Sequence, residues 1–94
     1  MSDYQRYTAD PTREVLRKAD EILTGRAGLS RSRESRHSVT YTGAEGTVVL
    51  DIHRHGVTTD VVARTNQLRT SKLDGVVRYL LDSLPYQPGD PITV

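Results

Sequence analysis

The sequence predicts one small α+β domain in the order α-β-β-β-α, with a three-stranded antiparallel meander flanked by two helices. Two stretches repeat apolar residues with the period of an α-helix, and three stretches between them alternate as β-strands do. A chain of 94 residues has room for one core only. The expected domain spans residues 11–84, between a flexible leader over 1–10 and a Pro- and Gly-containing tail over 85–94.

The first helix is expected to begin at Asp10-Pro11, because Asp is a favoured N-cap residue and Pro suits the first helical position. The apolar stripe that follows at helical spacing is Val15, Leu16, Ala19, Ile22 and Leu23. The end of this helix is open between two alternatives. Either the glycines at 25 and 28 end it near Thr24, or it continues toward Ser35 at a cost of about 1 kcal/mol per internal glycine.

Three stretches of strand character come next, over residues 38–42, 47–53 and 57–65. The side chains of the last two that we expect to face the core are Val48, Leu50, Ile52, Thr59, Val61 and Ala63. A two-residue turn at His55-Gly56 joins them into a hairpin, because Gly supplies the positive φ that tight turns need. This turn sets Leu50 opposite Val61.

The second helix is expected to begin at Ser71, an N-cap residue with Asp74 as its capping-box partner three residues on. Its apolar stripe is Leu73, Val76, Val77, Leu80, Leu81 and Leu84. Leu84-Pro85 ends the helix, because the residue before a proline is pushed out of the helical conformation.

The second face of the predicted sheet also carries apolar residues. Val49 and Val62 lie on it, opposite each other in the register of a His55-Gly56 turn. A single layer of helices covers one face only, and two helices on three strands make a thin core. We therefore expect a homodimer whose sheets or helices meet.

The composition excludes several classes of protein. The chain has no Cys, which excludes disulfides, thiolate metal sites, iron–sulfur clusters and cysteine nucleophiles. Its start is polar and no apolar run exceeds three residues, so we expect no signal peptide, no membrane helix and a cytoplasmic location. Neither a Gly-rich phosphate loop nor a nucleophile elbow is present, so we expect no enzymatic activity and no cofactor.

One possible metal site merits consideration. Asp51, His53 and His55 alternate along one strand, so that their side chains project to one side, and a carboxylate with two imidazoles suits Zn or non-haem Fe. The predicted register adds Asp60 opposite Asp51. The alternative is that His55 is the tip of the hairpin and the others form a solvated face. We expect this second arrangement, without a metal.

Cations are concentrated in one stretch, although the net charge is only +1 from 13 Lys and Arg against 12 Asp and Glu. The stretch holds Arg26, Arg31, Arg33 and Arg36 against Glu34. An Arg fork makes paired hydrogen bonds to phosphate oxygens, and counterion release drives the association. We expect these four arginines, assisted by Arg17 and Lys18 on the first helix, to contact the DNA backbone.

From Val39 to Leu84, apolar residues and glycines recur in a definite order. Val39-Thr40 opens a strand, a loop runs from Gly43 to Gly46, and His55-Gly56 marks the hairpin. The other matched positions are Val48, Leu50, Ile52, Val61, Ala63, Leu68, Leu73, Val76, Val77, Leu80 and Leu81. This pattern resembles the YbaB/EbfC family of small nucleoid-associated proteins, in which a helix precedes the strands, as the one from Pro11 does here.

The resemblance implies a homodimer with helices flanking a shared sheet, and DNA binding with little sequence preference. Some relatives are tied to protein secretion, so the alternative is a secretion-associated or chaperone-like adaptor that binds protein and not DNA. Two features depart from the family pattern: Arg64-Thr65 replaces an acidic-Pro step, and the last helix stops early, at Pro85. The double-stranded RNA-binding domain shares the element order, but its loop motif and Lys-rich helix start are absent here, where only Lys72 is present.

Overall fold

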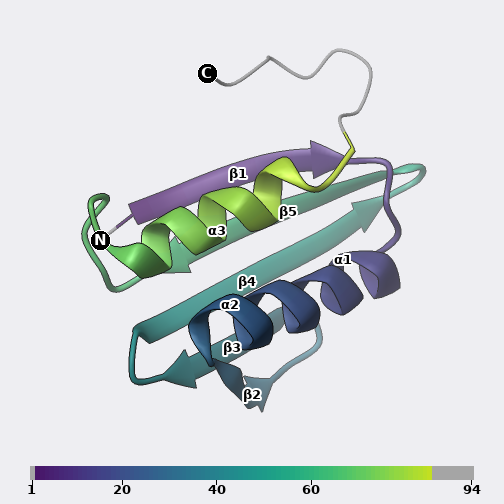
Figure 1. Cartoon of the computed structure of the whole chain (residues 1–94). Coiled ribbons are helices and arrows are strands. Elements are labelled where there is room, and N and C mark those ends of the chain that lie inside the picture. Colours follow the sequence, from purple (N-terminus) through teal and green to yellow (C-terminus); the bar gives the residue numbers. More distant parts are fainter. Residues whose placement is uncertain (1, 86–94) are drawn as a thin grey trace.

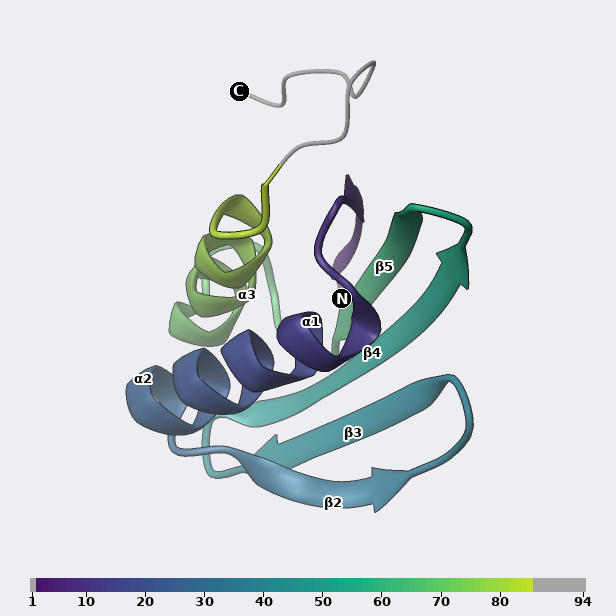
Figure 2. The ribbon, with the colours of Figure 1, turned by 90° about the vertical axis from the view of Figure 1, so that its right-hand side faces the viewer.

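The computed structural model of the protein describes residues 2–85, and its centre is a five-stranded antiparallel sheet with the helices on one face (Figures 1 and 2). The sheet order is β1-β5-β4-β3-β2. The strands are β1 (Ser2–Thr8), β2 (Ser30–Glu34), β3 (Ser38–Gly43), β4 (Gly46–His55) and β5 (Thr58–Thr65). The α+β class is confirmed, but the sheet has two more strands than the predicted meander, one at each edge.

The first helical stretch consists of three consecutive segments, α1 (Thr12–Ala19), the π-helical η1 (Asp20–Thr24) and α2 (Gly25–Ala27). It ends at Gly28, whose φ of 67° is left-handed and whose N–H donates to the Thr24 carbonyl at 3.1 Å. The predicted end near Thr24 is therefore three residues short. The longer alternative toward Ser35 is wrong, because residues 30–34 form β2.

The start of α1 also differs from the prediction. Pro11 is the N-cap residue, with an extended backbone at ψ 161°, and its carbonyl accepts from the N–H of Glu14 at 2.9 Å. Asp10 makes no capping hydrogen bond; its carboxylate accepts from Lys18 Nζ at 2.7 Å instead. The carboxylate that was expected to cap the helix is therefore paired with a lysine eight residues later in the sequence.

The expectation of a flexible leader is wrong for residues 2–8, which form β1 and pair with β5 from Ser2 opposite Thr65 to Thr8 opposite Thr59. Tyr4, Arg6 and Thr8 point toward the helical side. Tyr4 Oη donates to Asp74 at 2.8 Å, and Arg6 Nη2 donates to the Leu84 carbonyl at 2.6 Å. These inward positions hold no aliphatic side chain, so the sequence shows no hydrophobic alternation there.

The β4–β5 hairpin forms, but its turn residues are Gly56 and Val57, with His55 opposite Thr58. Gly56 has a φ of 61° at the first of these two positions, where a type II′ turn requires glycine. Leu50 therefore lies opposite Ala63, and the predicted Leu50–Val61 pairing is wrong by two residues. A shift of two residues keeps every side chain on its face. The predicted core residues of both strands are accordingly all buried.

The second helix, α3 (Lys72–Asp82), begins as predicted, with Ser71 Oγ accepting from the Asp74 N–H at 3.1 Å. All six residues of its apolar stripe are buried. The Asp74 carboxylate does not complete the predicted capping box, because the Ser71 N–H donates to the Leu68 carbonyl at 2.9 Å. Asp74 is instead fully buried and contacts Tyr4 and Arg78. The tail expected after Pro85 lies outside the described residues. No helix within residues 2–85 is long and apolar enough to cross a membrane.

The second face of the sheet is uncovered by the described helices (Figure 2). Val49 lies between Thr40 and Arg64 across the strands, and Val62 lies between Asp51 and Gln5. Both valines are half-buried and do not face each other, contrary to the predicted register. Polar neighbours surround them, so the face lacks the apolar pair from which a sheet-to-sheet dimer was expected.

Candidate functional site

The six cations predicted to contact DNA come from four places. Arg17 and Lys18 lie on α1, Arg26 on α2, Arg31 and Arg33 on β2, and Arg36 in the loop before β3. Five of them line two grooves that flank the first helix, and the sixth, Arg33, lies on the sheet. Arg33 is in register with Thr40, in the cross-strand row that contains Val49 and Arg64 of the open face.

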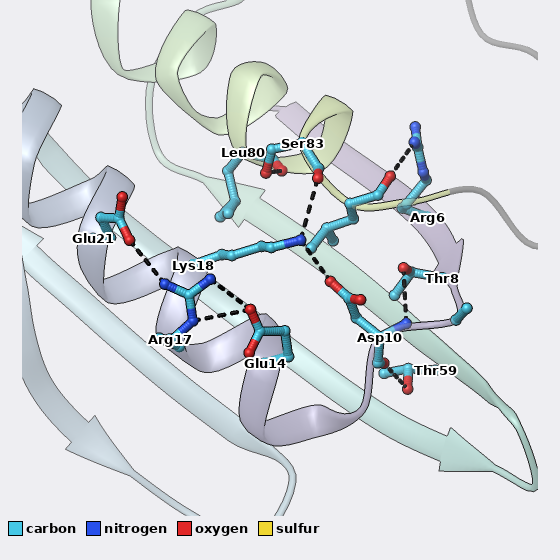
Figure 3. Close-up of polar contacts among 12 residues, drawn as sticks. Arg6, Thr8, Asp10, Glu14, Arg17, Lys18, Glu21, Thr59, Leu80 and Ser83 are labelled. Carbon is cyan, nitrogen blue, oxygen red and sulfur yellow. Dashed lines mark hydrogen bonds and ion pairs between the residues drawn. The ribbon is translucent and has the colours of Figure 1, made fainter.

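Arg17 and Lys18 are already held by carboxylates (Figure 3). Arg17 lies between Glu14, at 2.5 Å, and Glu21, at 3.0 Å. Its hydrogen bond lowers the pKa of Glu14. Lys18 Nζ contacts Asp10 at 2.7 Å and reaches the Ser83 carbonyl at 3.4 Å. These contacts join α1 to the segment before it and to the end of α3.

Arg31 belongs to a network between η1 and the edge of the sheet. Its guanidinium donates to both oxygens of Asp20, at 2.8 and 2.7 Å, and also contacts Glu34. Tyr41 Oη donates to the same Asp20 at 2.7 Å. Partial burial opposes ionisation of Asp20, but hydrogen bonds from Arg31 and Tyr41 outweigh it and lower the pKa. Burial and the Asp20 carboxylate together raise the pKa of Tyr41.

The first groove lies between the helix of residues 12–27 and α3, and we name it the α1–α3 groove. Its volume is about 330 Å³, and its lining is Arg17, Lys18, Glu21, Ile22, Arg26, Tyr79 and Ser83. The Arg26 guanidinium lies 3.9 Å from the centroid of the Tyr79 ring, a cation–π contact. Tyr79 remains 47% exposed. The groove thus combines three predicted cations with an exposed aromatic ring.

The second groove lies between α1 and the β2–β3 hairpin, and we name it the α1–β2 groove. Its main part has a volume of about 580 Å³ and is lined by Thr12, Arg13, Leu16, Arg17, Asp20 and Arg31. A pocket of about 270 Å³ adjoins it and is lined by Thr12, Leu16, Glu34, Ser35, Arg36, His37, Ser38, Val39 and Ile52. Thr12 and Leu16 line both parts, so the two adjoin each other, and we describe them together as one groove.

Sequence reasoning missed two residues of these grooves. Arg13 was not selected, although it precedes Arg17 by four residues and therefore shares its helix face. Tyr79 lies outside the apolar stripe of α3, and an exposed tyrosine in a helix gives no local signal of a partner. Its ring contacts the guanidinium of Arg26, and Arg26 lies 53 positions earlier in the sequence.

The possible metal ligands are not brought together. Asp51 pairs with Arg64 at 3.0 Å. His53 stacks on His37 with ring centroids 4.7 Å apart. Asp60, predicted opposite Asp51, lies opposite His53 because the turn is shifted. Among the residues that the structure describes, no group of three His, Asp or Glu side chains is placed to hold a metal ion.

Comparison with known proteins adds no family to this description. No protein-family model matches the sequence, and no curated protein matches it significantly. The resemblance to the YbaB/EbfC family therefore stays a prediction. The fold and the grooves describe the protein as a small α+β domain with two grooves on its helical side.

Proposed function

We propose that this protein is a non-enzymatic adaptor that binds another protein through the helical side of its sheet. The observation that carries the proposal is the exposed pair of Arg26 and Tyr79 in the α1–α3 groove, with the guanidinium 3.9 Å from the ring centroid. Arg and Tyr are among the residue types that contribute most binding free energy at protein interfaces. Their position in a groove between two helices suits a protein ligand.

The ion pairs around α1 also favour a protein over DNA. Arg17, Lys18 and Arg31 are each held by at least one carboxylate. A phosphate would have to displace these acidic side chains, which lowers the gain in binding free energy. A surface that presents both signs of charge instead complements a protein surface, whose charges are also mixed.

Binding to the DNA backbone is the second candidate. What favours it is that Arg26, Arg33 and Arg36 form no ion pair with any carboxylate of residues 2–85. Unpaired guanidinium groups are available to phosphate oxygens at no electrostatic cost. The protein would then act as a sequence-tolerant, nucleoid-associated homodimer of the YbaB/EbfC type.

A random peptide library displayed on phage and selected on the full chain tests the adaptor proposal. We expect a class of peptides whose binding, measured by fluorescence anisotropy, weakens about tenfold in Tyr79→Ala, because the exposed ring is lost from the groove. Tyr7→Ala is the matched control: Tyr7 is 41% exposed but lies on the opposite face of the sheet. A selection without any peptide class sensitive to Tyr79→Ala would contradict the proposal.

Titration of the same protein with duplex DNA at two salt concentrations decides between the two candidates. The adaptor proposal expects no DNA retention in a gel shift, even at low salt. If DNA is retained, the second candidate replaces the first. In that case we expect the double variant Arg33→Ala with Arg36→Ala to reduce the slope of log affinity against log salt concentration by about 2, because each lost phosphate contact removes roughly 0.9 from the slope.

A further inference from the structure

We propose that the α1–β2 groove binds an acidic peptide segment of a partner protein, with one apolar side chain of that segment seated in the pocket at the hairpin end. This groove lies on the other side of α1 from the Arg26–Tyr79 pair, and among residues 2–85 Arg17 is the one lining residue that the two grooves share. The proposal therefore names a second surface and does not depend on the function of the first.

The groove exists because the helices cover only part of the sheet. Figure 2 shows α1 crossing β4, with β3 and β2 beyond it at one side of the sheet. Arg31 of β2 donates to Asp20, and this contact joins the hairpin to η1. Beside this contact, an open groove of about 580 Å³ lies along α1 on the side of the hairpin.

The floor of the pocket is apolar. Leu16 of α1 is half-buried there, and Val39 of β3 and Ile52 of β4 are core residues that also line it. An apolar side chain placed on this floor would extend the core and remove its own surface from water. The volume of about 270 Å³ suits one large side chain.

The charges that remain available in the groove are positive. Asp20 and Glu34 both contact Arg31, and the lining of the groove carries four arginines against these two carboxylates. Arg13 and Arg36 form no ion pair with any carboxylate of the described chain. Arg13 lies in the first turn of α1, where the positive end of the helix dipole disfavours a cation. A carboxylate supplied by a ligand would relieve this repulsion.

The same features favour a peptide over a nucleic acid. A phosphate backbone has no apolar group to place against Leu16 and Ile52, whereas a peptide supplies acidic and apolar side chains at adjacent positions. The hydroxyl groups of Thr12, Ser35 and Ser38 line the pocket and can donate to peptide carbonyls. The expected ligand is therefore a short segment with Asp or Glu on both sides of a Leu, Ile or Phe.

The test uses the peptides selected from the phage library, synthesised with a fluorescent label. We expect a class enriched in Asp and Glu around one apolar residue, whose affinity falls at least about tenfold in the double variant Arg13→Ala with Arg36→Ala. Both side chains are exposed, so the variant should keep its fold, and circular dichroism checks this. Leu16→Ser should weaken the same peptides independently of charge.

The control separates this proposal from the preceding one. Tyr79→Ala, in the other groove, should change the affinity of the acidic class less than about twofold. Selected peptides without acidic enrichment, or an acidic class unaffected by the Arg13 and Arg36 substitutions, would overturn the proposal. Displacement of the labelled peptide by duplex DNA at low concentration would assign the groove to nucleic acid instead, and would overturn it as well.

Discussion

Asp20 is the residue at which the helical layer and the edge of the sheet meet. Its carboxylate accepts hydrogen bonds from Arg31 and from the hydroxyl of Tyr41, so one side chain joins η1, β2 and β3. The Tyr41 side chain is otherwise buried in the core. A buried hydroxyl without this acceptor would lose its hydrogen bonds to water without replacement. Asp20 therefore stabilises the folded state through hydrogen bonds with residues that are far from it in the sequence.

The first prediction concerns the pH dependence that Tyr41 imposes. Burial and Asp20 raise its pKa above the usual value of 10.0. The folded state therefore holds this proton more tightly than the unfolded state. The contribution to the free energy of unfolding is complete below pH 10.0 and is lost as the pH rises through the folded pKa. Tyr41→Phe is expected to flatten this alkaline loss.

Urea unfolding at pH 7 and in steps above pH 9 measures this effect. At neutral pH, Tyr41→Phe should cost about 1 kcal/mol, because the hydrogen bond to Asp20 is lost. Tyr7→Phe is the matched control, since Tyr7 is exposed on the open face. An alkaline decline in Tyr41→Phe as steep as in the parent protein would show that Tyr41 is not its source.

At the scale of elements, the helix of residues 12–27 contains Gly25 and is followed by Gly28, and the two glycines differ in backbone conformation. Gly25 is helical, with a φ of −70°, and Gly28 is left-handed, with a φ of 67°. Apart from the adjacent residues and the backbone of the helix itself, a methyl group added at either position would meet no atom within 4 Å. Substitution at these two sites therefore isolates the contribution of backbone conformation to the free energy of unfolding.

We expect Gly25→Ala to stabilise the protein by up to about 1 kcal/mol, because Ala loses less entropy in a helix. Gly28→Ala should destabilise it by about 1 kcal/mol, because an L-residue resists the left-handed conformation. Chemical denaturation of the two variants side by side measures both effects. Equal changes of the same sign would contradict the assignment of the helix end to Gly28.

The strands show how much an element depends on its partners. β4 and β5 could be predicted because Val, Leu and Ile alternate with polar residues along them. β1 and β2 could not, because every residue of β2 is exposed and the inward side chains of β1 include Arg6 and Thr8. β1 is placed by contacts with Asp74 and Leu84, which come from the far end of the chain.

At the scale of the whole molecule, the state of association is still a prediction. β1 and β2 end the sheet on its two sides, and an edge strand presents unpaired backbone groups to a second chain. β2 has the means to resist such pairing, with charged side chains and a register irregularity between Arg31 and Arg33. The unpaired backbone groups of β2 thus favour pairing with a second chain, whereas its charges and its register irregularity disfavour such pairing.

The homodimer stays a prediction that rests on the resemblance and on the two edge strands, because a five-stranded sheet under two helices already buries a core of its own. Size-exclusion chromatography with light scattering should give about 21 kDa, twice the 10.5 kDa of one chain. If β2 pairs with a second copy, Ser32→Pro should shift the equilibrium toward the monomer, since Pro lacks an N–H. A mass of 10.5 kDa at micromolar concentration would refute the homodimer.

The candidate site was only partly predictable. The Arg26–Arg36 stretch pointed to the right region, and five of the six predicted cations line one of the two grooves. The sequence does not reveal that Arg31 pairs with Asp20, or that Arg13 has no carboxylate partner among residues 2–85. Whether a cation is free depends on which carboxylate the fold places beside it, and these pairs join separate elements.

From the sequence alone one could predict the apolar side chains of α3, β4 and β5 that face the core, since the periods of 2 and 3.6 residues are properties of the local backbone. The sequence also determined the start of α3 at Ser71, whose hydrogen bond spans only three residues. The tertiary structure alone decided the two edge strands, the hairpin register and the pairing of the cations. These depend on polar groups such as Tyr4 with Asp74, and Arg31 with Asp20, which satisfy each other only after distant segments have met.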